Sequence, residues 1–343
     1  MLARAARRLP VGPGVRGVVE DVAEVAEPGT LEVLHEAGTI VRAPVEPPHP
    51  AFGSEREHTH PAAFRALLRN AHVAGVEPLV LASDRRALLA STYDREQLDK
   101  NPVLHGRLPL ARRLRGRHAI LALPWARNHF HWMLDALPRA ALLPSGGAHG
   151  VIVPSDPGPD RLWALDRVGI GRERVVELGV GEHLRVDELL FPSRAGGTGN
   201  PARWALDWLR ERLVPAPRRP GRRIYVSRAD AGLRRVVNED ALVAALEQEG
   251  FERFLPGALP LEDQLRTFAE ASVVVAPHGA GLVGLMACEP GTQIVELHSA
   301  AYVNACYYAL ADALELPYRY VLCEPVGGTD LRADPATVLA ALG

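Results

Sequence analysis

A histidine and two glycines follow directly after an apolar run in the C-terminal third of the chain. The run VVVAP is followed by His278, Gly279, Ala280 and Gly281, and the sequence then turns apolar again. Glycine lets a backbone approach a ligand closely, and the first N–H groups of a helix that begins here would point at an anion such as a diphosphate. The alternative is that the two glycines only form a tight turn that permits close helix packing. The pattern by itself leaves both interpretations open.

Further polar residues lie after the neighbouring apolar runs. These candidate donor-binding residues are Ser227, Arg228, Arg234, Arg235 and Glu296. In an open parallel sheet, ligands bind beyond the carboxyl ends of the strands, so residues at these places would meet at one edge. Arginine is suited to bind phosphate, and the carboxylate of Glu296 would accept hydrogen bonds from a ribose. For each arginine, the alternative is an ordinary solvated side chain.

A second set of polar residues lies in the segment NHFHWMLDALPR at 128–139. At about 100° per residue, a helix would bring Asn128, His131, Asp135 and Arg139 within a sector of about 80°. Apolar residues occupy the other side, so a solvated face is the simplest interpretation. However, the stripe contains Asn, His and Asp in place of Glu, Lys and Gln, and it follows a predicted strand. These two details favour a stripe that faces a cleft.

The elements that position the first set alternate regularly. The predicted strands are 222–228, 251–256, 272–277, 292–298 and 317–323, and the predicted helices are 238–250, 260–271, one after Gly281, and 302–316. Strands that alternate with helices of this length predict a parallel, doubly wound sheet. The C-terminal part is therefore predicted to be a Rossmann-like domain.

The first half of the chain is less regular. Its predicted strands are 118–124, 150–155 and 186–193, its predicted helical segments are 128–142, 158–168 and 201–214, and 79–93 predicts a hairpin. This pattern indicates an α/β domain with extra β structure at the N-terminus, although the first 60 residues are not placed. The proline-rich stretch RLVPAPRRPGRR at 212–223 is typical of a linker, so we predict domains at 1–215 and 216–343.

Composition limits the possible functions. A formal net charge of -2 and the lack of a basic run argue against a nucleic-acid partner. No apolar stretch approaches the roughly 18 residues that cross a bilayer, and the N-terminus lacks the apolar core of a secretory signal, so we expect a cytoplasmic protein. The three cysteines are too few and too widely spaced for a disulfide framework or a metal site. Lys100 is the only lysine, so arginine or backbone must hold any phosphate.

Three segments together resemble the family 61 glycosyltransferases, which include many bacterial polysaccharide-biosynthesis proteins. NHFHWMLDALPR resembles a NxxHWxxDxLPR motif, and YVSRADAGLRRVVNED and APHGAGLVGLMACEPGTQIVEL resemble two further motifs of that family. The order and spacing match across about residues 117–323. One departure is Gly284, which stands where asparagine is common. The resemblance implies a GT-B fold, in which two Rossmann-like domains face a cleft.

The resemblance also implies inverting transfer of a sugar from a nucleotide-sugar donor, without the Asp-x-Asp motif that would carry a metal. The chain contains no Asp-x-Asp. We therefore expect no bound metal or cofactor, a UDP- or GDP-linked donor, and a glycan or lipid-linked acceptor, with peripheral membrane contact left open. Asp135 or His131 would be the catalytic base, Asn128 would position the acceptor hydroxyl, and Arg139 would lie on the acceptor side. The alternative is a catalytically inactive GT-B-fold protein that binds a sugar or a nucleotide.

Overall fold

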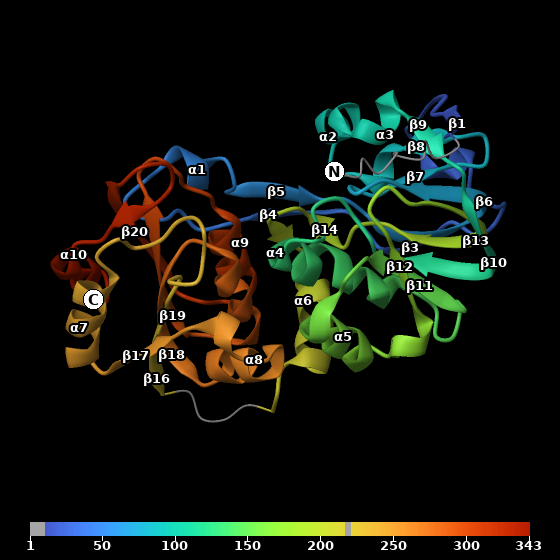
Figure 1. Ribbon diagram of the computed structural model, residues 1–343. Helices are drawn as coiled ribbons and strands as arrows, with labels where there is room; N and C mark the ends of the chain where they lie inside the picture. The colour runs from blue at the N-terminus through green and yellow to red at the C-terminus, as the bar shows by residue number, and fades with distance from the viewer. Residues whose placement is uncertain (1–10, 217–220) are drawn as a thin grey trace, which may run out of the picture. The chain divides into compact units, whose positions relative to one another are not determined.

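The computed structural model describes residues 11–216 and 221–343, and it divides the chain into two compact units (Figure 1). Unit 1 contains the described residues up to Glu36 together with Ala62–Ala195, and unit 2 contains Ala37–Pro61 and Gly196–Gly343. This division differs from the boundary predicted after residue 215. Residues 217–220 of the predicted linker lie outside the described residues.

Packing within unit 2 explains the difference. Helix α6 (Arg203–Leu213), predicted as part of the first domain, belongs to unit 2 because Arg210 donates to the backbone carbonyls of Met286 and Cys288 at 2.6 and 2.7 Å. The segment 37–61 belongs there because Tyr308 and Tyr320 donate hydrogen bonds to its backbone carbonyls. A local composition signal for a linker cannot reveal either contact.

Unit 1 is built on a nine-stranded mixed sheet in the order β12-β11-β10-β13-β6-β7-β8-β2, with β3 paired to β6. Its parallel part consists of β10 (Arg112–Ile120), β11 (Gly150–Pro154), β12 (Val175–Leu178) and β13 (His183–Pro192). Its remaining strands are β6 (Ala63–Ala74), β7 (Leu79–Leu81), β8 (Arg86–Leu88), β2 (Gly17–Val19) and β3 (Glu32–His35). The α/β class, the hairpin and the three strands predicted in this half are confirmed.

Short helices connect the strands of unit 1. They are α2 (Arg95–Lys100), α3 (Pro102–His105), α4 (His129–His131) and α5 (Gly158–Arg167), and β1 (Val11–Gly14) pairs with β9 (Arg107–Pro109). Helix α4 continues as a π-helix over Trp132–Ala136 and as a 3₁₀ helix over Leu137–Leu142. The segment predicted as one helix is therefore helical throughout, but its winding changes twice. π-turns of this kind are frequent at functional sites.

Unit 2 is built on a six-stranded sheet in the order β17-β16-β18-β19-β20-β21. The first five strands are parallel: β16 (Arg222–Val226), β17 (Phe251–Phe254), β18 (Ala271–Pro277), β19 (Gln293–Ser299) and β20 (Tyr318–Pro325), while β21 (Leu331–Arg332) is antiparallel. The helices are α7 (Glu239–Gln248), α8 (Leu261–Ala269), a 3₁₀ helix at Ala280–Ala287, α9 (Cys306–Ala313) and α10 (Pro335–Ala340). The predicted alternation of strands and helices is confirmed.

The N-terminal residues contribute to both units. Strands β4 (Gly38–Val41) and β5 (Glu57–His60) pair with each other in unit 2, with α1 (Pro50–Gly53) between them, and β14 (Gly196–Gly197) pairs with β15 (Asn200–Pro201). The ring of Phe52 packs against Tyr308, Tyr318 and Tyr320. The predicted extra β structure near the N-terminus is present, but part of it belongs to the C-terminal unit.

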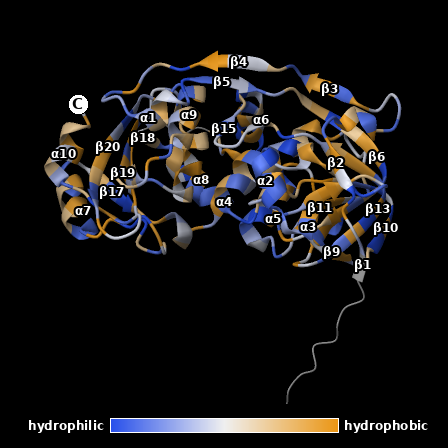
Figure 2. Cartoon of the chain, turned by 90° about the horizontal axis from the view of Figure 1, so that it is seen from above, coloured by the Kyte–Doolittle hydropathy of each residue, from blue (hydrophilic) through white to orange (hydrophobic). Residues whose placement is uncertain are grey.

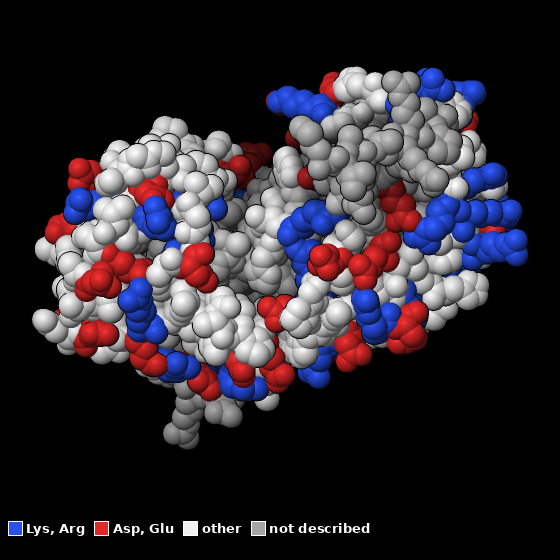
Figure 3. Space-filling view, viewed as in Figure 1, with Lys and Arg blue, Asp and Glu red and all other residues white. Residues whose placement is uncertain are grey.

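Apolar residues lie in the buried strands of the described units, and most charged residues lie on their surfaces. Strands such as β11, buried at every position, are hydrophobic, whereas α2 and α5 present hydrophilic residues (Figure 2). Lysine and arginine gather beside acidic residues near β10 and β13 (Figure 3). Arg113 pairs with Asp187 and Arg117 with Glu188, both at 2.7–2.8 Å, so carboxylates offset much of this charge. No helix within the described ranges combines the length and apolar character needed to cross a bilayer.

Candidate functional site

Strand order in unit 2 creates a switch point between β16 and β18. These strands are neighbours, but the chain continues from β16 to β17 on one side and from β18 to β19 on the other. Connecting segments that leave in opposite directions open a crevice at the carboxyl ends, and ligands bind in such crevices. Arg228 follows β16, and His278, Gly279, Ala280 and Gly281 follow β18. The structure thus brings together most of the predicted donor-binding residues.

Two arginines at this point have no acidic partner. Neither Arg228 nor Arg234 forms an ion pair with a carboxylate in the described part of the chain, and the Nε atom of each is buried without a hydrogen-bond partner. Arg228 donates to the carbonyl of Leu233 at 3.0 Å, and Arg234 lies over the ring of Tyr302 at 5.4 Å. Burial, followed by the charge of Arg234, lowers the pKa of Arg228. Two adjacent cations with unused donors are suited to bind an anion.

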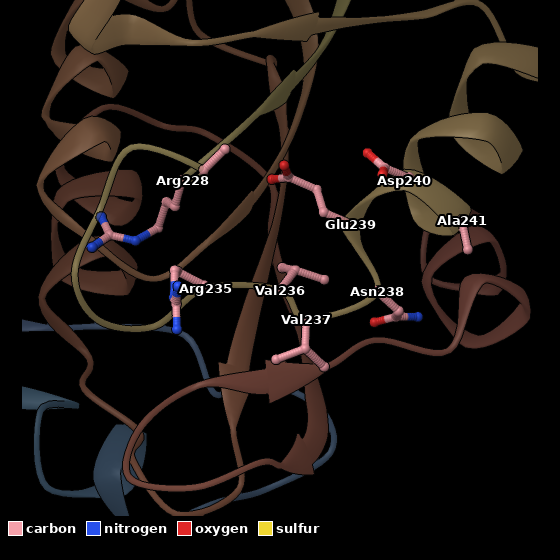
Figure 4. A pocket seen from close by; sticks show the side chains of 9 residues that line it. Arg228, Arg235, Val236, Val237, Asn238, Glu239, Asp240 and Ala241 are labelled. Carbon is pink, nitrogen blue, oxygen red and sulfur yellow. The ribbon is translucent and has the colours of Figure 1, made fainter.

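Two other predicted donor-binding residues are engaged elsewhere. Arg235 forms an ion pair with Asp330 at 2.9 Å, and the buried hydroxyl of Ser227 donates to the carboxylate of Glu239 at 2.9 Å. Glu239 also accepts from Tyr225 and Arg253. The predicted ligand contact of the buried Ser227 therefore does not fit the structure, whereas the one predicted for Arg235, which is exposed and lines the same hollow as Arg228, stays a prediction. A hollow of about 450 Å³ lies between Arg228 and the start of α7, with Arg228 and Arg235 on the same side of it (Figure 4).

Glu296 does not reach the surface, so the predicted contact with a ribose is wrong. It is 0% exposed, and one carboxylate oxygen faces Nδ1 of His278 at 2.6 Å, while the other accepts from Tyr318 at 2.6 Å. Burial alone would raise the pKa of Glu296, but the neighbouring His298 and His278 outweigh burial and hold this pKa at about 2. Burial lowers the pKa of His278. Glu296 therefore acts as an anchor that orients the His278 ring.

His278, Glu296 and His298 have ligating atoms within 4.8 Å of one another, as a metal site requires. However, each oxygen of Glu296 already has a close donor, and all three side chains are buried. Both carboxylate oxygens of Glu296 thus have donors from the protein, whereas Nδ1 of His298 is buried without a partner among the described residues. The expectation of a metal-free site stays a prediction.

The three glycines of the turn have different structural roles. A Cβ on Gly279 would lie 1.8 Å from Nη1 of Arg228, and the carbonyl of Gly279 accepts from the hydroxyl of Tyr307 at 2.7 Å. A Cβ on Gly281 would make ordinary contacts of 3.4 and 3.6 Å with Val226 and Pro256. A Cβ on Gly284 would lie 2.0 Å from the ring of Phe268, which leaves no room for an asparagine. Close approach explains Gly279, helix packing explains Gly284, and Gly281 does not need to be glycine.

Replacing Gly279 with alanine is expected to weaken nucleoside-diphosphate binding by roughly 10- to 100-fold, because the new methyl group displaces the Arg228 guanidinium and its charge-assisted bonds. Stability should change by less than about 1 kcal/mol, since only the end of a flexible side chain has to move. Calorimetric titration and thermal unfolding measure the two quantities. Gly281→Ala is the matched control and should bind like the wild type, and equal losses in both variants would contradict this role of Gly279.

Unit 1 has a switch point of its own, between β10 and β13. The parallel strands lie in the order β12-β11-β10-β13, so the chain leaves β10 on one side and reaches β13 on the other. The segment 121–128 and the helical stretch that follows lie after β10, and Arg194 follows β13. The second predicted set of residues therefore lies at the place where an open sheet binds ligands.

His131 and Asp135 are in direct contact there. Nδ1 of His131 lies 2.7 Å from Oδ2 of Asp135, and the same oxygen accepts from the hydroxyl of Tyr93 at 2.8 Å. Asp135 is 6% exposed. Burial, followed by the charge of Asp135, raises the pKa of Tyr93, so its hydroxyl remains a donor. A neutral imidazole that donates from Nδ1 carries its lone pair on Nε2, so this arrangement favours His131 as the base and Asp135 as the residue that orients it.

Aromatic rings surround His131. The ring centroids of Trp125, Phe130 and Tyr93 lie 5.3, 5.2 and 5.8 Å from that of His131. Arg194 lies over the Tyr93 ring at 5.5 Å, and burial lowers its pKa. Apolar surroundings lower the effective dielectric constant, so the charge of Arg194 acts more strongly on a group bound among these rings.

Arg139 and Asn128 have structural roles that the sequence analysis did not predict. Arg139 is 1% exposed and donates to the carbonyls of Ala122, Pro192 and Ser193, which lie after β10 and at the end of β13. Burial lowers its pKa to about 9. Asn128 caps α4 by accepting from the N–H of Phe130 at 2.8 Å. The predicted acceptor contact of Arg139 is therefore wrong, and the one predicted for Asn128 stays a prediction.

Several residues of these sites were not predicted from the sequence, among them Tyr93, Arg194, Tyr302 and Glu239. Arg194 directly follows the predicted strand 186–193, and it lies two residues after the end of β13, as Arg228 lies two residues after the end of β16, so its place could have been noticed. Tyr93 and Tyr302 carry no such signal, because they reach the sites through loops distant in sequence from their partners.

Comparisons with known proteins agree with this picture. Residues 129–295, slightly less than half of the chain, match the model of the family described as Glycosyltransferase 61. The matched range includes His131, Asp135, Arg228, Arg234 and His278. A segment of 61 residues is 34% identical to a beta-1,2-xylosyltransferase of Oryza sativa subsp. japonica and covers 18% of this chain and 11% of that protein. Both comparisons support the predicted class of enzyme, a glycosyltransferase.

Proposed function

We propose that the protein is an inverting, metal-independent glycosyltransferase of the GT-B class that uses a nucleotide-sugar donor. The observation that carries this proposal is the pair of half-buried arginines at the switch point of unit 2, Arg228 and Arg234, whose Nε atoms are buried without a partner and which pair with no carboxylate among the described residues. A nucleoside diphosphate supplies the missing negative charge. The family match over residues 129–295 supports the same class of ligand.

On the donor side, the two guanidinium groups neutralise charge that develops on the leaving diphosphate. The first N–H groups of the 3₁₀ helix Ala280–Ala287 add donors and a favourable helix dipole. Because arginines carry this charge, a divalent metal is not required. UDP and GDP are the proposed nucleotides.

On the acceptor side, His131 accepts the proton of the attacking hydroxyl at Nε2 while Asp135 holds its Nδ1–H. The acceptor oxygen forms a bond to the anomeric carbon, the bond from that carbon to the diphosphate breaks, and the nucleoside diphosphate leaves with the electron pair. A single displacement of this kind inverts the anomeric centre. The proposed acceptor is a glycan or a lipid-linked sugar.

A ligand screen in the presence of EDTA tests the proposal. We expect UDP or GDP to raise the melting temperature, since a ligand at about 100 times its Kd adds roughly 2.7 kcal/mol of apparent stability. The corresponding nucleotide sugar should be slowly hydrolysed when no acceptor is present. Binding without any turnover would instead indicate an inactive binding protein, and strict dependence on Mn²⁺ or Mg²⁺ would contradict the metal-independent mechanism.

A further inference from the structure

Trp125 is held in an unusual conformation beside the candidate base. Its backbone has φ 58°, a left-handed conformation that bulky side chains rarely adopt, and its residue surface is 43% exposed. Its backbone N–H donates to the carboxylate of Glu77, and its indole ring stacks on the ring of Tyr93 with centroids 5.0 Å apart and planes 21° apart. Strain of this type persists only where surrounding contacts hold it, and it is concentrated at functional sites.

A hollow of about 370 Å³ lies next to the exposed indole. Polar side chains from α2 and the residues around it line this hollow: Glu77, Asp94, Glu96, Gln97 and Lys100. Lys100 pairs with Glu96 along the helix, so Glu77 and Asp94 remain as excess negative charge. An aromatic face next to carboxylates and an amide is a combination that can bind both the C–H face and the hydroxyl groups of a sugar.

Gln97 supplies an independent sign of a missing ligand. Its Oε1 accepts from the N–H of Tyr93 at 2.8 Å, which fixes the orientation of the amide. The Nε2 atom is therefore a donor, and it is buried without a partner in the described part of the chain. A buried donor that lacks an acceptor is costly, and Gln97 lines the hollow, so an oxygen atom of a ligand bound there would offer this donor a partner.

We propose that this hollow binds a sugar ring of the acceptor, with the indole of Trp125 as the stacking platform and Nε2 of Gln97 as a hydrogen-bond donor. The assignment of this ring to the acceptor rests on the proposed function. The distance of 5.3 Å between the Trp125 and His131 rings places a bound sugar next to the base. Because carboxylates outnumber cations in the hollow, the ring is a neutral or amino sugar in preference to a uronic acid.

Saturation-transfer NMR with methyl glycosides of glucose, galactose, xylose, glucosamine and glucuronic acid tests the subsite directly. We expect at least one neutral or amino glycoside to bind the wild type more strongly than the glucuronide. Trp125→Gly should weaken that binding by about tenfold or more without loss of stability, because glycine removes the ring and relieves the backbone strain together. Trp125→Phe keeps a ring and should retain most of the binding.

Gln97→Glu tests the role of the amide Nε2 as a hydrogen-bond donor. It keeps an oxygen that accepts from Tyr93 but replaces the N–H group, so it should weaken sugar binding while the protein stays folded. Unchanged sugar binding in Trp125→Gly, or binding of the glucuronide alone, would overturn the subsite. UDP and GDP binding to the same samples separates the two proposals, since wild-type protein that binds no nucleotide contradicts the proposed function whatever the sugar does.

Discussion

Replacing His131 with alanine should reduce sugar transfer by roughly 10²- to 10⁴-fold, because the imidazole is the proposed acceptor of the proton from the attacking hydroxyl. Donor affinity should stay within about twofold of the wild-type value, since the proposed role of His131 is to accept a proton, and the proposed diphosphate ligands are Arg228 and Arg234. Initial rates with a donor and an acceptor, together with calorimetric titration of the nucleotide, measure both quantities. The expected result is therefore loss of sugar transfer with nucleotide binding retained.

Asp135→Asn is the matched comparison. The sequence left the choice between Asp135 and His131 open, whereas the buried carboxylate, with His131 and Tyr93 on one oxygen, indicates an orienting role. Asp135→Asn should therefore retain more activity than His131→Ala, and Tyr93→Phe should lose less than either. A larger loss in Asp135→Asn, with near-normal transfer by His131→Gln, would instead assign the base to Asp135.

Replacing Arg228 with methionine should weaken nucleoside-diphosphate binding by roughly 10- to 150-fold, which corresponds to the 1.5–3 kcal/mol of a hydrogen bond to a charged group. At the same time, the melting temperature of the free protein should stay constant or rise. Burial and the neighbouring Arg234 disfavour the charge of Arg228, so methionine removes an unfavourable group while it keeps most of the packing. Nucleotide affinity, measured by titration, should thus fall while the melting temperature stays constant or rises.

Arg235→Met provides the control for that result. Arg235 lies in the same loop, but its charge is paired with Asp330 at an exposed position, where ion pairs contribute about 0–1 kcal/mol. Its loss should have little effect on nucleotide affinity. If both variants lose affinity equally, general attraction by the loop, and not the half-buried pair Arg228 and Arg234, explains binding.

The fold of unit 2 could be predicted because its signals are local. The strands from β16 to β20 are short segments that alternate with helical segments of the sequence, and the polar residues Arg228 and His278 come shortly after β16 and β18. The same local signals correctly indicated that Arg228 and His278 meet at one edge, because the carboxyl ends of parallel strands share an edge.

Burial of polar groups could not be predicted in the same way. Arg139 and Glu296 have the residue types and positions of ligand-binding groups, yet the first is covered by the carbonyls at the end of β13 and the second by Tyr318 of β20. These partners come from strands that are distant in sequence. A helical projection correctly placed His131 near Asp135, since residues four apart remain close, but it contains no information on what covers the helix.

The order in which the two units occur along the chain constrains how the protein can be synthesised. The chain passes between the units after Glu36, Pro61 and Ala195, so Ala37–Pro61 leave the ribosome before most of the unit to which they belong. The ring of Phe52 cannot pack until Tyr308 and Tyr320 have been made, and until then it can form non-native apolar contacts. Unit 1 can complete its sheet once Ala195 has been made, whereas unit 2 closes only when Tyr308 and Tyr320 pack against the earlier segment that contains Phe52.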